Sequence, residues 1–322
     1  MVDSRTPESR IRIGISSCLL GQKVRFDAGH KHDRFITDVL GPYFEFVPVC
    51  PELEVGMGVP RESVKLQGNP EAPLMVGNKS GKDWTARMNR YADRRVRRRD
   101  MTDFSGYILK KDSPSCGMER VKVYGESGMP ERRGRGLFAA ALMRQHPLLP
   151  VEEEGRLNDF KIRENFIVRV FAYHRLRILF KSSFRRGELV RFHAAHKYLL
   201  LAHSPKHHKL LGQLAANMKR YEVPVFREKY SALFMEALKM KSTARKNVNV
   251  LHHILGFLKD HIDPSDKRDI LQVIEDYRNE LVPLIVPVTL LKHYVNKHGI
   301  EYIQDQIYLN PHPKELMLRN HV

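Results

Sequence analysis

Cysteine is scarce in this chain, with three residues among 322, and tryptophan occurs only once. A small, odd number of cysteines does not suit a secreted protein held together by disulfides. Long apolar runs are missing as well: we find no stretch of about 18 uncharged apolar residues, so we expect no membrane span. The polar start, MVDSRTPESR, lacks the apolar core of a secretion signal. These absences together predict a cytoplasmic protein with reduced thiols.

Acidic residues are outnumbered, since 37 Asp and Glu face 55 Lys and Arg, and the net charge is +18. The excess of basic residues is present in both halves of the chain, so no single tail carries it. A positive field of this kind favours a polyanionic partner, most simply a nucleic acid. A basic enzyme without such a partner is the alternative that composition leaves open.

The first 150 residues alternate short apolar runs with stretches of helical periodicity. Strands are predicted at 11–15, 44–49, 106–109 and 121–124, and helices at 30–40, 84–98 and 137–145. This alternation predicts a Rossmann-like α/β domain over residues 1–150, with a mainly parallel sheet. The Gly- and Pro-rich segment 51–81 is expected to be a long functional loop.

The pattern changes at residues 147–158, where prolines and an acidic run predict a linker. Strand signals then vanish, and apolar residues recur at helical spacing through the rest of the chain. We therefore predict an all-α C-terminal domain over residues 158–322.

The three cysteines, Cys18, Cys50 and Cys116, each follow a predicted strand and sit among turn-forming residues. The carboxyl ends of parallel strands share one edge of a sheet, so these thiols are expected to meet at one site. The alternative is three unrelated buried cysteines. Three thiolates suit a zinc ion with one open position, or an iron–sulfur cubane with one iron left free, and spacing does not decide between them.

The segments around the cysteines resemble the TudS-type thiouracil desulfidases over residues 11 to about 148. They read CLLGQKVRFDAGHKHD, VCPELEVGMGVPRE and LKKDSPSCG. Residues 160–322 resemble the helical domain of YbgA-like proteins in FHAAHKYLLLAHS, ARKNVNVLHHILGFLK and LNPHPKELMLRN. The fused arrangement is similar to RudS-type desulfidases, which remove sulfur from 4-thiouridine in tRNA.

This resemblance implies that the three cysteines ligate a 4Fe–4S cluster whose fourth iron is open to the thiocarbonyl sulfur of the base. It implies a net hydrolysis without redox change, with uridine as product. Such chemistry needs a carboxylate that takes a proton from water and a hydroxyl near the base. Glu52 and Ser113 match the family's proposed catalytic positions, and the alternatives are a helix-capping acid and a turn serine. Ser17 and Ser115 are expected to donate hydrogen bonds to the cluster ligands.

Contacts with substrate or RNA are expected from a few basic residues. Arg61 is expected to position substrate, although it could equally be a solvated loop residue. Arg94, Arg95 and Arg98 belong to the densest basic run and are expected to contact phosphates, although such runs are often solvated helix faces. Lys246 is a further candidate in the helical domain.

The expected partner is tRNA containing 4-thiouridine, bound by the helical domain, and the protein is expected to be a monomer. Three other functions stay open. The first is desulfidation of free thiouracil or 4-thiouridine monophosphate, and the second is a zinc-dependent hydrolase or deaminase built on the three thiolates. The third is a nucleic-acid-binding or stress-response module whose metal is structural.

Overall fold

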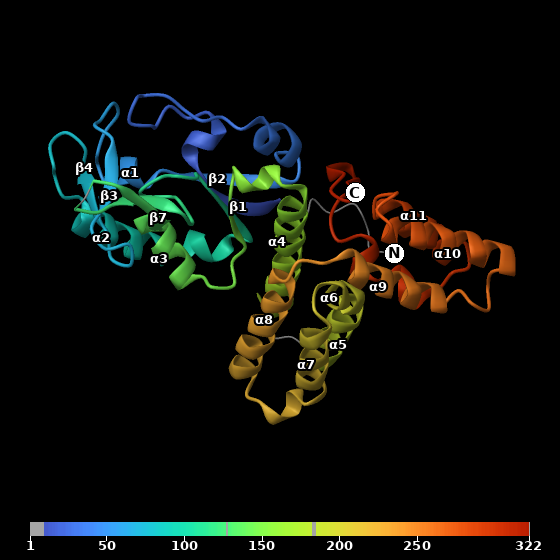
Figure 1. Ribbon diagram of the computed structural model, residues 1–322. Helices are drawn as coiled ribbons and strands as arrows, with labels where there is room; N and C mark the ends of the chain where they lie inside the picture. Colours follow the sequence, from blue (N-terminus) through green and yellow to red (C-terminus); the bar gives the residue numbers. More distant parts are fainter. Residues whose placement is uncertain (1–9, 127, 182–184, 322) are drawn as a thin grey trace. The chain divides into compact units, whose positions relative to one another are not determined.

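The structure is a computed structural model, which describes residues 10–126, 128–181 and 185–321. The chain divides into two compact units, Met1–Asp159 and Phe160–Val322 (Figure 1). Within the described residues, no helix has the length and apolar character needed to span a bilayer. The first unit is α/β and the second is helical, which confirms the predicted fold class.

The first unit contains a sheet of four parallel strands in the order β2–β1–β5–β8. These strands are β1 (Ile11–Ser16), β2 (Phe44–Val49), β5 (Gly106–Leu109) and β8 (Val151–Glu153). Burial along the whole of β5 is typical of parallel strands that are covered on both faces. Because β8 lies inside residues 147–158, the linker predicted there is wrong.

A second sheet in the same unit has the order β4–β3–β6–β7 in the described part of the chain. Its strands are β3 (Val64–Gln67), β4 (Leu74–Gly77), β6 (Val121–Tyr124) and β7 (Pro130–Gly134). The central pair, β3 and β6, is parallel, and each of them has an antiparallel outer neighbour. Strands β3 and β4 and the short helix α1 (Pro51–Glu54) occupy much of residues 51–81, so that segment is not the long loop expected.

Two longer helices of the first unit, α2 (Thr85–Val96) and α3 (Leu137–Gln145), confirm the helices predicted at 84–98 and 137–145. The Phe138 ring lies 6.4 Å from that of Tyr91 and 5.9 Å from that of Tyr107, so aromatic contacts join both helices to β5. In the predicted helix 30–40, only Phe35–Leu40 is helical, as a single π-type segment.

The second unit is built from helices in its described residues. They are α4 (Phe160–Lys181), α5 (Arg186–Ala195), α6 (Lys197–His203), α7 (Pro205–Ala216), α8 (Val223–Lys239), α9 (Ala244–Gly256), α10 (Pro264–Arg278), α11 (Ile285–Lys297) and the short α12 (Glu301–Gln304). Aromatic residues pack between them: the Phe192 ring lies 5.4 Å from Phe234, and Tyr230 stacks on Phe234 at 6.2 Å. Buried apolar side chains at helical spacing are therefore the basis of this unit, as the sequence predicts.

Candidate active site

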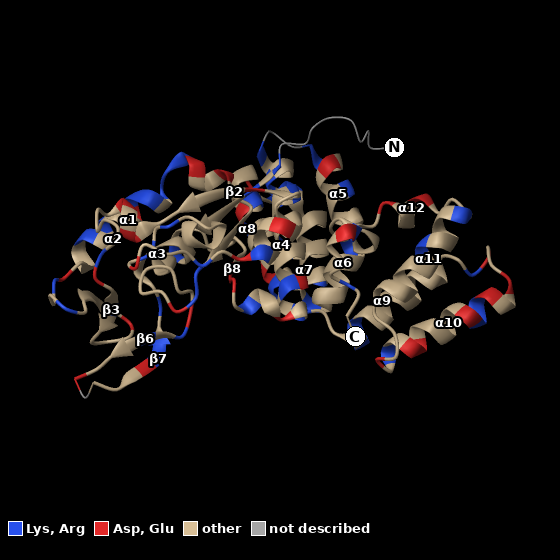
Figure 2. Cartoon of the chain, turned by 90° about the horizontal axis from the view of Figure 1, so that it is seen from above, with Lys and Arg blue, Asp and Glu red and all other residues tan. Residues whose placement is uncertain are grey.

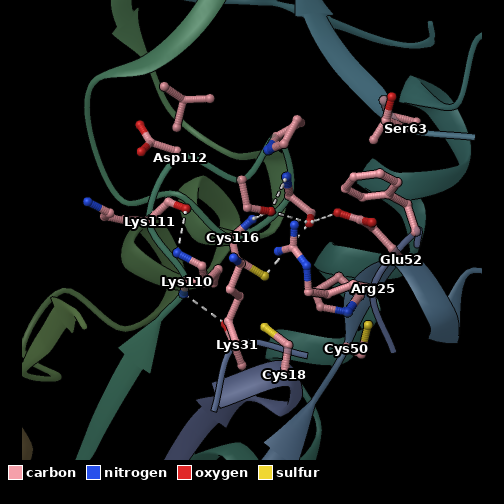
Figure 3. A pocket seen from close by; sticks show the side chains of 18 of the residues that line it. Cys18, Arg25, Lys31, Cys50, Glu52, Ser63, Lys110, Lys111, Asp112 and Cys116 are labelled. Atoms are coloured by element: carbon pink, nitrogen blue, oxygen red, sulfur yellow. Dashed lines mark hydrogen bonds between the residues drawn. The ribbon is translucent and has the colours of Figure 1, made fainter. Parts of the chain in front are cut away.

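The three cysteines follow three neighbouring strands of the parallel sheet. Cys18 lies in the 3-10 turn η1 (Ser17–Leu20) after β1, Cys50 precedes α1 after β2, and Cys116 lies in the loop between β5 and β6. Because β2, β1 and β5 are adjacent and parallel, their carboxyl ends lie side by side. All three thiols line one cavity, and none of them is in a disulfide (Figure 3).

The Cys116 loop is fixed by helix α3. The backbone N–H groups of Phe138 and Ala139 donate to the Ser115 carbonyl oxygen at 3.0 and 3.1 Å. A Cβ atom on Gly136 would lie 2.5 Å from the carbonyl carbon of Ser115, so this approach requires glycine. The first turn of α3 therefore sets the position of Ser115 and Cys116 at the cavity.

The cavity has a volume of about 480 Å³, and strands of the second sheet and residues next to them supply part of its wall. That wall includes Ser63, Val64, Lys65, Asn78, Val121, Lys122, Tyr124 and Arg132. Among the described residues that line the cavity, eight are Lys or Arg and two, Glu52 and Asp112, are acidic. The site is thus a basic pocket whose volume suits a small ligand.

Burial raises the pKa of all three thiols. It raises the pKa of Cys18 to about 11, against the opposing charges of Lys110 and Arg25, and it also raises the pKa of Cys50 and of Cys116. Cysteine binds a metal as the deprotonated thiolate. A bound cation would therefore offset the cost of burying three negatively charged sulfurs.

The donor set fits an iron–sulfur cluster. All three thiols line the same cavity, and cysteine thiolates are the ordinary protein ligands of such clusters. Within the described ranges, no three His, Cys, Asp or Glu side chains are arranged to hold a single metal ion.

Glu52 is held at the cavity from both of its carboxylate oxygens. Arg61 donates to Oε2 from Nε at 3.2 Å and from Nη2, and Ser115 Oγ donates to Oε1 at 2.7 Å. Arg61 also donates from Nη1 to the carbonyl oxygens of Val24, at 3.0 Å, and Gly58, at 2.9 Å. The carboxylate that sequence adjacency places beside Cys50 is thus fixed in orientation by tertiary contacts.

The segment that carries this site is similar to known proteins. Residues 13–154 match the family described as 2-thiouracil desulfurase, and YbbK of Bacillus subtilis (strain 168), which is uncharacterised, is 30% identical over 45% of this chain and 97% of its own length. The chain belongs to the 2-thiouracil desulfurase family. The solved 4Fe–4S-dependent thiouracil desulfidase TudS is 31% identical over 47% of this chain and 95% of its own, with a TM-score of 0.37.

The helical unit matches other proteins. Residues 197–313 match a family of unknown function, DUF1722. The uncharacterised protein YbgA of Escherichia coli (strain K12) is 27% identical over 51% of this chain and 98% of its own length. This chain therefore joins a desulfurase-family unit to a YbgA-like unit.

The family segment contains most of the residues singled out from the sequence. Ser113 lies in the Cys116 loop and lines the cavity with Glu52 and Ser115. Ser17 is buried beside Cys18 and also lines the cavity. The alternative of a solvated loop residue is wrong for Arg61, because only 6% of its side chain is exposed.

The basic run at the end of α2 and just beyond it divides between surface and interior. Arg94 and Arg98 are exposed, as a phosphate contact requires. Arg95 is buried and pairs with Asp100 at 3.0 Å and Glu54 at 3.7 Å, so it is not available to an external phosphate.

Lys246, at the start of α9, is bound within the helical unit. Its Nζ donates to the carbonyl oxygens of His203, at 2.7 Å, and Lys241, at 3.3 Å. The His203 carbonyl is at the last residue of α6, and the Lys241 carbonyl lies just beyond the end of α8, so both are hydrogen-bonded by this lysine. They give Lys246 a structural role in addition to the RNA contact predicted for it.

Sequence reasoning missed the wall formed by the second sheet and the side chain of Phe26. Lys65, Lys122 and Tyr124 reach the cavity because β3 and β6 pair across more than fifty residues of sequence. Nothing in their local pattern signals that pairing. Phe26 lies within the first cysteine segment, and its 38% exposure at the cavity is unusual for phenylalanine.

Proposed function

We propose that this protein is an iron–sulfur-dependent desulfidase that removes sulfur from 4-thiouridine in tRNA and leaves uridine. The observation that carries the proposal is the cavity itself. Three free thiols, a fixed carboxylate and a serine hydroxyl line it, and they come from the ends of three adjacent parallel strands and their loops. Membership of the 2-thiouracil desulfurase family supports the choice of a thiolated pyrimidine.

Cys18, Cys50 and Cys116 would hold a 4Fe–4S cluster. With three protein thiolates, such a cluster supplies one iron that acts as a soft Lewis acid toward the substrate sulfur. No other metal ligand is needed from the chain, and the surrounding Lys and Arg side chains offset the negative charge of the thiolates.

Glu52 would accept a proton from the water that adds to the thiocarbonyl carbon. Its Oε2 is held by Arg61 and its Oε1 by Ser115, so the carboxylate faces the cavity in one orientation. Ser113 supplies the hydroxyl beside the reacting base. A carbon–oxygen double bond replaces the carbon–sulfur double bond, both protons of water end on sulfur as hydrogen sulfide, and no electrons are exchanged.

A polyanionic substrate is supported by charge. Lys and Arg are present on the elements of both units, as Figure 2 shows, and eight of them line the cavity within the described residues. A base in folded tRNA must be swung out to reach such a pocket, as happens in other enzymes that act on bases. Phosphate contacts would contribute affinity without reading sequence.

The test compares thiolated tRNA, 4-thiouridine monophosphate and 4-thiouracil as substrates of the full-length protein with its cluster assembled without oxygen. We expect the highest kcat/KM with tRNA. We also expect that advantage to fall steeply between 50 and 200 mM salt, because bound phosphates release counterions. Equal kcat/KM for tRNA and monophosphate at every salt concentration would remove tRNA from the proposal.

Free nucleotides are the second candidate, and the cavity favours them in one respect. All of the proposed catalytic residues belong to the first unit, and a volume of about 480 Å³ is enough for a pyrimidine nucleotide. The same comparison decides: a salt-insensitive preference for the monophosphate would support this second function.

A further inference from the structure

Ser115 connects the two proposed catalytic side chains. Its hydroxyl is almost completely buried, with 1% of the residue exposed. Its Oγ lies 2.7 Å from Glu52 Oε1 and 3.0 Å from Ser113 Oγ. It also lies 3.7 Å from Cys116 Sγ, so this single hydroxyl has three possible hydrogen-bond partners.

The direction of these hydrogen bonds follows from the number of protons. A hydroxyl carries one proton, and an ionised carboxylate only accepts, so Ser115 donates to Glu52. The contact between the two serines then requires Ser113 to be the donor. Ser113 Oγ already accepts from the backbone N–H groups of Ser115, at 3.3 Å, and Cys116, at 3.1 Å, which leaves its own proton free for Ser115. The order is therefore Ser113 to Ser115 to Glu52.

The Cys116 sulfur is the weaker competitor for the Ser115 proton. Hydrogen bonds to a carboxylate are short, and 2.7 Å is in their range. The Cys116 sulfur lies much farther away, at 3.7 Å, so even as a cluster-bound thiolate it would receive the longer contact. The Ser115 proton is thus directed to Glu52.

We propose that Ser115 is a positioning residue for desulfuration, which holds the Glu52 carboxylate and the Ser113 hydroxyl in one hydrogen-bonded line at the cavity. This role rests on the proposed function, and it adds to the hydrogen bond to a cluster ligand expected from the sequence, which is present as the 3.7 Å contact with Cys116 Sγ. The surrounding structure fixes Ser115 accordingly. Its carbonyl oxygen accepts from two N–H groups of α3, and Gly136 lets that helix approach its backbone.

The test is Ser115→Ala in the full-length protein, assayed on thiolated tRNA or 4-thiouridine monophosphate, whichever the parent protein turns over faster. We expect unchanged iron and sulfide content, an unchanged visible spectrum and a KM within about twofold of the parent. We expect kcat to fall roughly 10- to 100-fold, as loss of a hydrogen bond to a charged group predicts. Ser115→Thr keeps the hydroxyl and should restore most of kcat.

Ser204→Ala is the matched control, because Ser204 is also buried and its hydroxyl is hydrogen-bonded, to His207 in the helical unit. It should lower stability and leave kcat unchanged. An unchanged kcat in Ser115→Ala overturns the proposal. A fall in kcat that matches a loss of iron or a changed spectrum also overturns it and assigns Ser115 to the cluster.

Failure of the proposed function is a separate outcome, recognised when the parent protein with a full cluster turns over neither substrate. The contact is then tested by unfolding free energies of Ser115→Ala, Glu52→Ala and the double variant. A coupling between the two substitutions supports the hydrogen-bonded line, and strict additivity overturns it.

Discussion

Replacing Arg61 by methionine is the most direct test of how the site is held together. Arg61 and Glu52 form an ion pair with 6% and 15% of their side chains exposed, so little water is available to either charge. Methionine keeps most of the volume of the arginine stem but removes every donor. Of its side-chain hydrogen bonds within the described residues, Glu52 would keep the one from Ser115, and the Val24 carbonyl would lose its 3.0 Å contact with the guanidinium.

The expected cost follows from leaving one charge buried without its partner. Removing one member of a buried pair typically destabilises a protein by about 3–5 kcal/mol. Because Glu52 retains partial exposure and one hydrogen bond, we expect Arg61→Met to lower the free energy of unfolding by roughly 2–4 kcal/mol. Urea denaturation of the cluster-free protein, followed by circular dichroism, measures this change.

The double variant Glu52→Gln/Arg61→Met separates the charge from the packing. It should recover part of the stability lost in Arg61→Met, since no uncompensated carboxylate remains. Glu52→Gln alone should cost less, because Arg61 keeps its carbonyl acceptors. A cost below about 0.5 kcal/mol for Arg61→Met would be that of an ordinary surface residue and would refute the reasoning.

Three further predictions follow from other parts of the structure. Cys116→Ser should abolish activity and cluster retention together, measured as iron per protein, while circular dichroism stays unchanged. Gly136→Ala forces a Cβ atom to 2.5 Å from the Ser115 backbone, so it should cost about 1–3 kcal/mol and reduce bound iron, and a normal iron content would contradict the tight approach. Burial lowers the pKa of His196 to about 3 and of His203 to about 4, so the unfolded chain takes up protons below its pKa of about 6.5 while the folded chain does not. Stability should be fully present above pH 6.5 and should fall by roughly 2–3 kcal/mol per histidine as the pH approaches 4, and urea midpoints that do not change across this range would contradict that burial.

The strands that carry the cysteines could be predicted from the sequence because each is a short apolar run followed by a polar turn. Parallel topology then brings their ends together with no further information. The same reasoning failed for β8, whose sequence VEE resembles a linker. Glu152 and Glu153 are buried there because Arg156 pairs with the first and the Met118 N–H donates to the second at 2.7 Å. Such partners are tertiary, and local composition does not indicate them.

Arg95 shows a different kind of error, for which a signal was present. The charge pattern groups it with its basic neighbours, although it follows Met88, Tyr91 and Ala92 at helical spacing on the buried face of α2. Periodicity therefore predicts the inward direction of this arginine, whereas charge alone predicts the surface. On this helix the periodicity was the better guide.

Glu52 illustrates why position and orientation differ in how well they can be predicted. Its place at the site follows from its position two residues after Cys50, since a short helix begins at the end of that strand. Its orientation depends on Arg61 and Ser115, which are 9 and 63 positions away in the sequence. Adjacency in the sequence also predicts a hydrogen bond from Ser115 to Cys116. The Ser115 hydroxyl makes a shorter contact with the Glu52 carboxylate than with the Cys116 sulfur. Chain neighbours bring a residue to an active site, but the direction in which its proton or carboxylate points is set by groups that only the fold brings near.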